Sequence, residues 1–414
     1  MEAYAQVLLY AIPGFVILVA LESVYAYAVK GVIFRGMDII SSLSSGITNL
    51  LKDVLKLTVV IIGYDMVYEH VALINHEPSW IVYALAFIGL DFASYWHHRL
   101  AHKVNIFWNR HVIHHSGEDF NMATALRQSI SVFVSLGFIF LFPAALLGVP
   151  PEVIAVVAPL HLFMQFWYHT EMIGKMGWLE YIIVTPSQHR VHHAMNSIYL
   201  DKNLAAIFCV WDRAFGTFQE ELDEHPPVYG VTRQVNTWNP IKINFQHLFL
   251  LIKDAWYAQN WIDKLKIWFM PTGWRPADVA ERFPVISADS NNFEKYNPPS
   301  TFFSKCWTWF QFIVLILMMW HFLLKIADIA AEDLLVYAVF MFLHIYSFTT
   351  LMDWKKSAFW TELVKSIFGI GILYWLGDWF LVEEFFVGLN SVVLGYLIFS
   401  PIVVGWIVVS KEVV

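Results

Sequence analysis

The sequence predicts an all-α polytopic membrane protein, with about nine transmembrane helices and a cytoplasmic, histidine-rich helical domain for two metal ions. Composition is the first observation behind this prediction, because 58% of the 414 residues are hydrophobic, 14% are charged and 17% are aromatic. Soluble domains are about 45–50% apolar and about 25% charged. The second observation is that 11 of the 17 histidines fall between His97 and His193. The net charge of −8 offers no basic surface for nucleic acid, and two cysteines argue against a disulfide framework.

Apolar stretches long enough to cross a bilayer, which takes roughly 20 residues, set the expected spans. They cover about 7–29, 52–72, 79–96, 129–149, 151–173, 306–326, 333–352, 359–381 and 385–409. The second stretch is the weakest because charged residues such as Lys52 and Asp53 interrupt it. Pro150 and Pro151 break the chain between the fourth and fifth stretches, which predicts a hairpin.

The spans divide the chain into four segments. Residues 1–96 are expected to form N-terminal transmembrane helices, and 97–222 a metal-binding core that includes a transmembrane hairpin at 129–173. Residues 223–300 are expected to be cytoplasmic or interfacial, and 301–414 to form C-terminal transmembrane helices. Within the third segment, residues 244–269 alternate apolar and charged faces. This pattern predicts either an amphipathic helix in the membrane interface or a helix packed on the domain's own core.

Charges between the spans indicate an orientation. Lysine and arginine follow the first, third, fifth, seventh and ninth spans, and acidic residues lie at the opposite ends, with Lys325 as the exception. Positive charge favours the cytoplasmic side. We therefore expect an integral membrane protein with its N-terminus outside, its C-terminus inside and its histidine clusters on the cytoplasmic face, in a bacterial inner membrane or the endoplasmic reticulum.

Three short histidine clusters carry the candidate chemistry. In the first, His98 and His102 are spaced i and i+4 on one face of a helix, whereas His97 would lie about 140° away from His102. The other two clusters share the pattern HxxHH. Their members are His111, His114 and His115, and His189, His192 and His193.

Eight imidazoles exceed what one tetrahedral metal ion needs. They predict two metal ions with about four ligands each, and imidazole suits zinc, copper, iron and nickel. Neutral ligands leave the charge of the ions uncompensated, so nearby carboxylates are expected to orient the histidines and balance that charge. The candidates by sequence proximity are Glu118, Asp119, Glu171, Asp201 and Asp212. The isolated histidines are expected to be ordinary polar residues; they are His70, His76, His225, His247, His321 and His344.

The clusters and their flanks resemble the fatty acid hydroxylase/sterol desaturase superfamily of membrane di-iron oxygenases, and within it most resemble the alkylglycerol monooxygenase family. The likeness covers roughly residues 35–222 and includes the HxxxH and both HxxHH motifs. Its matching stretches are 91–102, 111–121, 123–129, 165–171, 185–193, 201–203 and 211–218. Carried over by position, the eight cluster histidines would be catalytic iron ligands. Some superfamily members add a histidine pair where this chain has Gln165 and His169, so His169 is a candidate ninth ligand, and whether Gln165 or His97 completes a metal shell stays open.

The resemblance implies a membrane oxygenase that uses two irons, O2 and tetrahydrobiopterin to cleave the ether bond of alkylglycerols and lyso-ether lipids, releasing a fatty aldehyde and a glycerol derivative. Two departures bear on substrate and cofactor identity: Lys103 replaces a usual glutamate, and Gln188 opens the third cluster where relatives have histidine. One alternative is oxidation of another lipid, namely a fatty acyl chain, an ornithine lipid, a sterol or a carotenoid. A second alternative is a metal transporter, although its ligands would be expected nearer the bilayer midplane.

Overall fold

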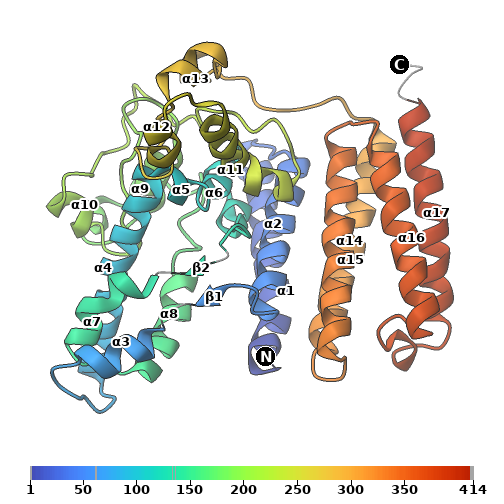
Figure 1. Cartoon of the computed structure of the whole chain (residues 1–414), viewed down its shortest axis with the longest axis horizontal. Coiled ribbons are helices and arrows are strands. Elements are labelled where there is room, and N and C mark those ends of the chain that lie inside the picture. Colours follow the sequence, from blue (N-terminus) through green and yellow to red (C-terminus); the bar gives the residue numbers. More distant parts are fainter. Residues whose placement is uncertain (1, 61–62, 133, 136, 411–414) are drawn as a thin grey trace.

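The computed structural model describes residues 2–60, 63–132, 134–135 and 137–410, which are helical almost throughout (Figure 1). The α-helices are α1 (Glu2–Tyr25), α2 (Gly36–Val54), α3 (Tyr64–Val71), α4 (Trp80–Lys103), α5 (Asn105–Trp108), α6 (Val112–His115), α7 (Phe142–Leu146), α8 (Pro151–Phe163), α9 (Pro186–His193), α10 (Val210–Ala214), α11 (Pro240–Tyr257), α12 (Trp261–Lys266), α13 (Ala277–Arg282), α14 (Phe302–Leu324), α15 (Ala331–Met352), α16 (Ala358–Leu376) and α17 (Leu389–Ser410). Tighter or wider helical turns are η1 (Ala26–Lys30), η2 (Met122–Leu126), η3 (Gly137–Leu141), η4 (Gly177–Tyr181), η5 (Ser290–Asn292) and η6 (Val382–Glu384). The all-helical prediction is confirmed, apart from one parallel pair of two-residue strands in the described residues, β1 (Val59–Val60) and β2 (Val134–Ser135).

Five helices in the described residues are long and apolar enough to cross a membrane. They are Ala5–Lys30, which joins α1 to η1, and α14, α15, α16 and α17. These five correspond to the first expected span and to the last four. The chain is therefore an integral membrane protein by the length and composition of its helices.

The other four expected spans do not correspond to helices of this kind in the described residues. Helix α4 covers nearly all of 79–96 and continues to Lys103; it is long enough to span a membrane, but it is not among the helices that are also apolar enough. The described parts of 52–72 and 129–149 contain short helices and strand residues instead of one helix, and residues 61–62, 133 and 136 lie outside the described chain. In 151–173 the helix stops at Phe163, and the chain that follows places His169 beside the cluster histidine His189. Continuous spanning helices at these three places were thus wrong predictions.

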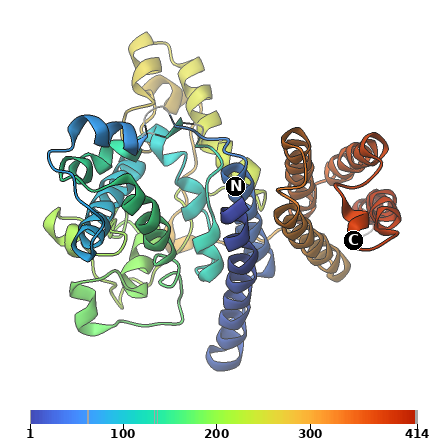
Figure 2. The same cartoon turned by 90° about the horizontal axis from the view of Figure 1, so that it is seen from below.

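The helices form two groups with α1 and α2 between them. Helices α14–α17 lie side by side, and α1 and α2 pack against them around a core that includes Ile40, Phe312 and Phe340 (Figures 1 and 2). On the other side, α4 packs on α7 and α8 through residues such as Val82 and Val153. The described ends of the chain lie at opposite ends of the helices, as an odd number of spans requires.

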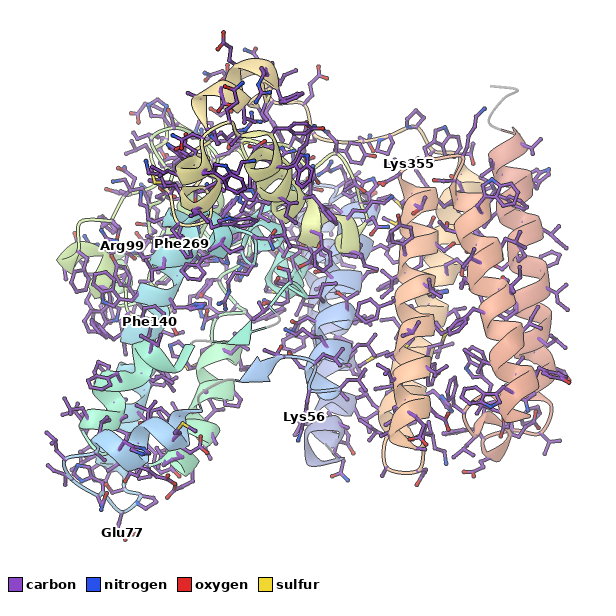
Figure 3. All side chains as sticks on the ribbon, in the orientation of Figure 1. Lys56, Glu77, Arg99, Phe140, Phe269 and Lys355 are labelled. Carbon is purple, nitrogen blue, oxygen red and sulfur yellow. The ribbon has the colours of Figure 1, made fainter. Side chains whose placement is uncertain are left out.

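Charged side chains lie at both ends of this arrangement. Lys355 lies at the upper end of α15 in Figure 3, and Lys56 and Glu77 lie at the lower end of the molecule. Lys325, the exception to the charge rule, forms ion pairs with Asp328 and Glu384 at its own end. Its charge is therefore balanced locally. Which face of the membrane the upper end occupies stays a prediction.

Residues 244–269 form two helices rather than the single predicted one. Helix α11 ends at Tyr257 because the backbone of Ala258 turns extended, and Asn260 then caps α12 by accepting a hydrogen bond from the Ile262 N–H at 2.9 Å. The two helices lie over the upper side of α5 and of the histidine-bearing helices α4 and α6 (Figure 1). They thus cover the candidate site described next.

Candidate metal centre

The structure brings nine histidines together in two adjoining groups. Within each group, one nitrogen from every member lies within 4.8 Å of one from every other member. The first group consists of His98, His102, His111, His115 and His192, and the second consists of His114, His169, His189 and His193. His169, which sequence reasoning left as a candidate, thus joins the eight cluster histidines.

Each HxxHH motif is shared between the two groups. His111 and His115 enter the first group, while His114, which points to another side of the short helix α6, enters the second. In α9 the division is reversed, since His192 joins the first group and His189 and His193 join the second. Positions i and i+4 share a helix face, whereas position i+3 is rotated away from i+4. The motif therefore holds two nitrogen-lined sites next to each other, with the His115 and His193 rings stacked at 4.4 Å between centroids.

In the first group the Nε2 atoms face inward. His98 Nε2 lies 2.8 Å from His111 Nε2, and His115 Nε2 lies 3.1 Å from His111 Nε2 and 3.2 Å from His102 Nε2. The opposite nitrogens point outward to acceptors. His98 Nδ1 contacts the Leu204 carbonyl at 2.8 Å and His192 Nδ1 the Lys202 carbonyl at 3.0 Å.

These carbonyls come from a tight turn at residues 199–204. Asp201 and Asn203 both adopt the left-handed backbone conformation, with φ of 58° and 52°. The Asn203 side chain anchors the turn by donating to the Gln188 and Gln219 carbonyls at 3.0 and 2.7 Å. A left-handed residue other than glycine is uncommon and needs such support.

The second group is built in the same way. His169 Nε2 lies 2.9 Å from His189 Nε2, and His189 Nε2 lies 3.1 Å from His193 Nε2. His169 Nδ1 bonds the Gln165 carbonyl at 2.9 Å, and His114 Nδ1 bonds the Arg127 carbonyl at 3.3 Å. Phe120 and Tyr168, both buried, pack their rings on His189 and keep water from this group.

The protonation of these rings favours a bound cation. Because His114 and His169 each donate through Nδ1 to a carbonyl, their Nε2 atoms carry no proton in the neutral ring. These two acceptor atoms nevertheless lie 3.4 Å apart. The Nε2 atom of His192 is also buried without a hydrogen-bond partner among the described residues. Lone pairs that converge in this way fit metal ions, so the nine residues are suited to hold two of them.

Burial keeps the imidazoles neutral. It lowers the pKa of His111, His115, His189 and His193 well below the usual value, and neighbouring histidines lower each pKa further. Burial likewise lowers the pKa of His114 to about 4. Since only the neutral ring binds a metal ion, these nitrogens are ready as ligands at neutral pH.

Only one of the five expected carboxylates contacts a cluster histidine within the described residues. Asp201 Oδ1 lies 3.3 Å from His102 Nδ1. Asp212 contacts no cluster histidine directly. It accepts hydrogen bonds from the backbone N–H groups of Leu204 and Ala205, and so it supports the Leu204 carbonyl that orients His98. The remaining three have other partners: Glu118 and Asp119 bind Arg35, and Glu171 interacts with Tyr229.

The remaining histidines lie outside both groups. The His97 ring packs edge-on against Phe140 at 5.8 Å between centroids. Gln165 directs its side chain to His161, whose Nε2 lies 2.9 Å from the buried carboxylate of Asp91. None of the six isolated histidines (His70, His76, His225, His247, His321 and His344) belongs to either group.

Sequence reasoning missed the Asp91 site and the backbone acceptors. Asp91 accepts from the Ile207 and Phe208 N–H groups at 2.8 and 3.0 Å and from Trp211 Nε1 at 2.8 Å. It therefore ties α4 to the segment that follows the third cluster. A single aspartate within an apolar stretch was the available signal.

A cavity of about 640 Å³ adjoins the histidines. His102, His115, His192 and His193 form part of its wall, so it reaches both groups. Apolar residues of α5, α6 and α11 contribute much of the remaining lining, among them Trp108 and Leu250. A molecule bound in this cavity would therefore contact histidines of both groups.

Comparison with known proteins identifies the class first. A family model described as fatty acid hydroxylase matches residues 83–217, a range that contains all nine histidines. The fold and the site thus define a membrane enzyme of the fatty acid hydroxylase superfamily. No solved structure matches the chain.

Individual relatives identify the family more narrowly. Alkylglycerol monooxygenase from Homo sapiens is 35% identical over 364 residues, which cover 86% of this chain and 80% of the relative. The Xenopus tropicalis protein of the same name is 34% identical over 359 residues, covering 85% and 79%. An ornithine lipid hydroxylase from Rhizobium tropici is 29% identical over 161 residues, covering 38% of this chain and 48% of the relative. The chain belongs to the alkylglycerol monooxygenase family and is an oxidoreductase, which confirms the predicted enzyme class and leaves the transporter alternative without support.

Proposed function

We propose that this protein cleaves the ether bond of alkylglycerols and lyso-ether lipids with O2 and a reduced pterin such as tetrahydrobiopterin. One oxygen atom of O2 enters the C–H bond on the alkyl carbon next to the ether oxygen. The resulting hemiacetal breaks into a fatty aldehyde and a glycerol derivative. The second oxygen atom leaves as water, with two electrons and two protons supplied by the pterin.

The convergence of nine neutral imidazoles in two groups, six of them buried and three half-buried, carries this proposal, and the relatives' names supply the substrate class. The first five histidines would hold one iron and the other four would hold the second. When bound, the irons supply the activation of O2. The protein orients the imidazoles through Asp201 and the carbonyls of Leu204 and Lys202, and it limits access of water through aromatic walls such as Phe120.

The position of the site suits an amphiphilic substrate. We propose that the upper end of α4 faces the cytoplasm, as the lysines and arginines of the neighbouring loops favour. The alkyl tail can then stay among the helices while the polar headgroup occupies the cavity. The division into segments 1–96, 97–222, 223–300 and 301–414 stays a prediction, and α4 (Trp80–Lys103) continues across its first boundary.

A second candidate is hydroxylation of a different lipid by the same centre. Two observations favour this second reaction. The chain matches an ornithine lipid hydroxylase, and it has Lys103 where the family resemblance implies a glutamate. Both reactions need the same metal ligands, so only product analysis separates them.

The test is fatty aldehyde release by the detergent-purified protein. We would supply 1-O-hexadecylglycerol, Fe(II), tetrahydrobiopterin and O2, with the His192→Ala variant as the inactive control and Gln165→Ala as a variant outside the two groups. Pterin-dependent aldehyde from the wild type and Gln165→Ala, but not from His192→Ala, is the expected result. A protein that holds two irons and makes no aldehyde would refute ether cleavage in favour of the second candidate.

A further inference from the structure

The cavity beside the histidines is lined by an arginine, Arg233, that forms no ion pair with a carboxylate of the described residues. Arg233 and Arg275 both line the cavity, on the wall formed by the chain around α11 and α13. Asp254 binds Arg275 through both of its oxygens, at 2.5 and 2.9 Å. By contrast, the buried Nη1 atom of Arg233 has no hydrogen-bond partner among the described residues.

The other ionisable groups of the wall do not compensate for Arg233. Asp201 is held by Lys103 at 2.6 Å and by His102. His247 is neutral, because burial and, to a smaller extent, the charge of Arg233 lower its pKa to about 4. Thr272, another lining residue, also has a buried hydroxyl without a partner. Arg233 is half-buried, and the nearby carboxylate of Asp254 is already bound by Arg275 through both of its oxygens. This wall is therefore suited to bind an anionic, oxygen-rich group.

The volume and the lining of the cavity also indicate what kind of molecule carries this anionic group. Its volume of about 640 Å³ falls within the range of ordinary ligand sites. Its lining is largely apolar between the arginines and the histidines, with residues such as Trp108, Ile243 and Leu251. A lipid whose reacting carbon meets the histidines and whose headgroup carries a phosphate fits both features. Guanidinium groups bind phosphate through paired N–H donors.

We propose that Arg233 is a specificity-determining residue that binds the phosphate of lyso-ether phospholipids, while neutral alkylglycerols bind without it. This inference rests on the proposed function for its substrate class. It assigns the headgroup to the wall made by residues 230–287, and it leaves the pterin to a different surface of the site.

Equilibrium binding tests this assignment without turnover. Iron-free protein in nonionic detergent would be titrated with radiolabelled 1-O-hexadecylglycerol 3-phosphate and, separately, with 1-O-hexadecylglycerol. The wild type should bind the phosphate lipid more tightly. Arg233→Gln should weaken that binding by about 10- to 100-fold, the effect of losing hydrogen bonds to a charged group, and should change binding of the neutral lipid by less than about twofold. Arg233→Lys should recover part of the loss.

The matched control is Arg282→Gln, since Arg282 is an exposed arginine of α13 that pairs with Asp278 outside the cavity. It should leave both affinities unchanged, and thermal unfolding should show that all variants are folded. Equal weakening of both lipids, or no preference of the wild type for phosphate, overturns the proposal. Aldehyde assays are not part of this readout, so failure of ether cleavage would be seen separately.

Discussion

His102 and Asp201 form the one direct contact between a cluster histidine and a carboxylate in the described residues, with Nδ1 and Oδ1 3.3 Å apart. The second oxygen of Asp201 accepts a hydrogen bond from Lys103 at 2.6 Å. The family resemblance implies a glutamate at the position of Lys103, and a glutamate there would face Asp201 with a like charge. In this chain the lysine instead fixes the carboxylate that orients His102, so the departure affects a partner of the metal site and not a ligand.

Replacing Asp201 by asparagine should weaken metal binding without removing a ligand. The amide keeps the shape but loses the charge that favours the Nδ1-protonated ring of His102, and partners of this kind contribute about 10- to 100-fold to metal affinity or activity. Iron titration of the apoprotein would measure the loss. Glu118→Gln serves as the control, because Glu118 binds Arg35 and contacts no cluster histidine. Equal iron affinities of the Asp201→Asn variant and the wild type would contradict this role.

His169 should be a metal ligand, whereas Gln165 and His97 should not. The His169→Ala variant removes one of only four nitrogens in the second group. We expect it to retain about one iron per chain, since the five-histidine group is intact, and to lose activity. His97→Ala should keep two irons because His97 packs on Phe140. Metal analysis of the purified variants checks this; two irons in His169→Ala would show that His169 only packs beside the centre.

The sequence predicted well which histidines come together, because their spacing along a helix is local. Spacings of three and four residues place His111, His114 and His115 on known faces of a helix whatever the rest of the fold does. His98 was distinguished from His97 by the same rule. The partners of these histidines were less predictable, since backbone carbonyls such as that of Leu204 have no residue-type signal.

The membrane spans were less predictable than the histidine groups. Hydropathy identified α14–α17 correctly, but at 129–149 and 151–173 it could not separate a spanning helix from apolar chain that packs on α4. Apolar composition is common to both situations. The end of α8 at Phe163 depends on the long-range requirement that His169 reach His114 and His189, which composition does not encode.

The C-terminal helices contain a buried ion pair whose disruption should destabilise the protein. The side chains of Lys365 and Glu362, both on α16, are fully buried and form an ion pair. Lys365 also donates a hydrogen bond to the Tyr396 hydroxyl at 2.7 Å. Lys365→Met leaves the Glu362 carboxylate without its cation, at a cost of about 3–5 kcal/mol. The double variant Lys365→Met/Glu362→Gln should recover much of this loss, because neither charge is then buried. Thermal unfolding in detergent would compare them, and a double variant less stable than Lys365→Met would contradict the explanation.

The outer face of α12 should lie in the membrane interface, which would decide between the two interpretations of residues 244–269. Trp261, Leu265 and Phe269 are 76%, 71% and 74% exposed, so they do not pack on the protein's own core. Figure 3 places Phe269 below Lys355, at the height of the upper part of the spanning helices. Aromatic and apolar side chains at that depth are typical of a helix lying at the lipid surface.

Spin labels test this placement in reconstituted vesicles. The Cys306→Ser variant, which removes the exposed native thiol, would carry either Leu265→Cys or Lys266→Cys on neighbouring faces of the same helix. A nitroxide at 265 should collide more often with O2, which concentrates in lipid, and less often with a water-soluble nickel chelate than one at 266. Since the two labels share a helix and differ mainly in direction, equal accessibilities would mean that α12 stands clear of the membrane and that its apolar face serves another contact.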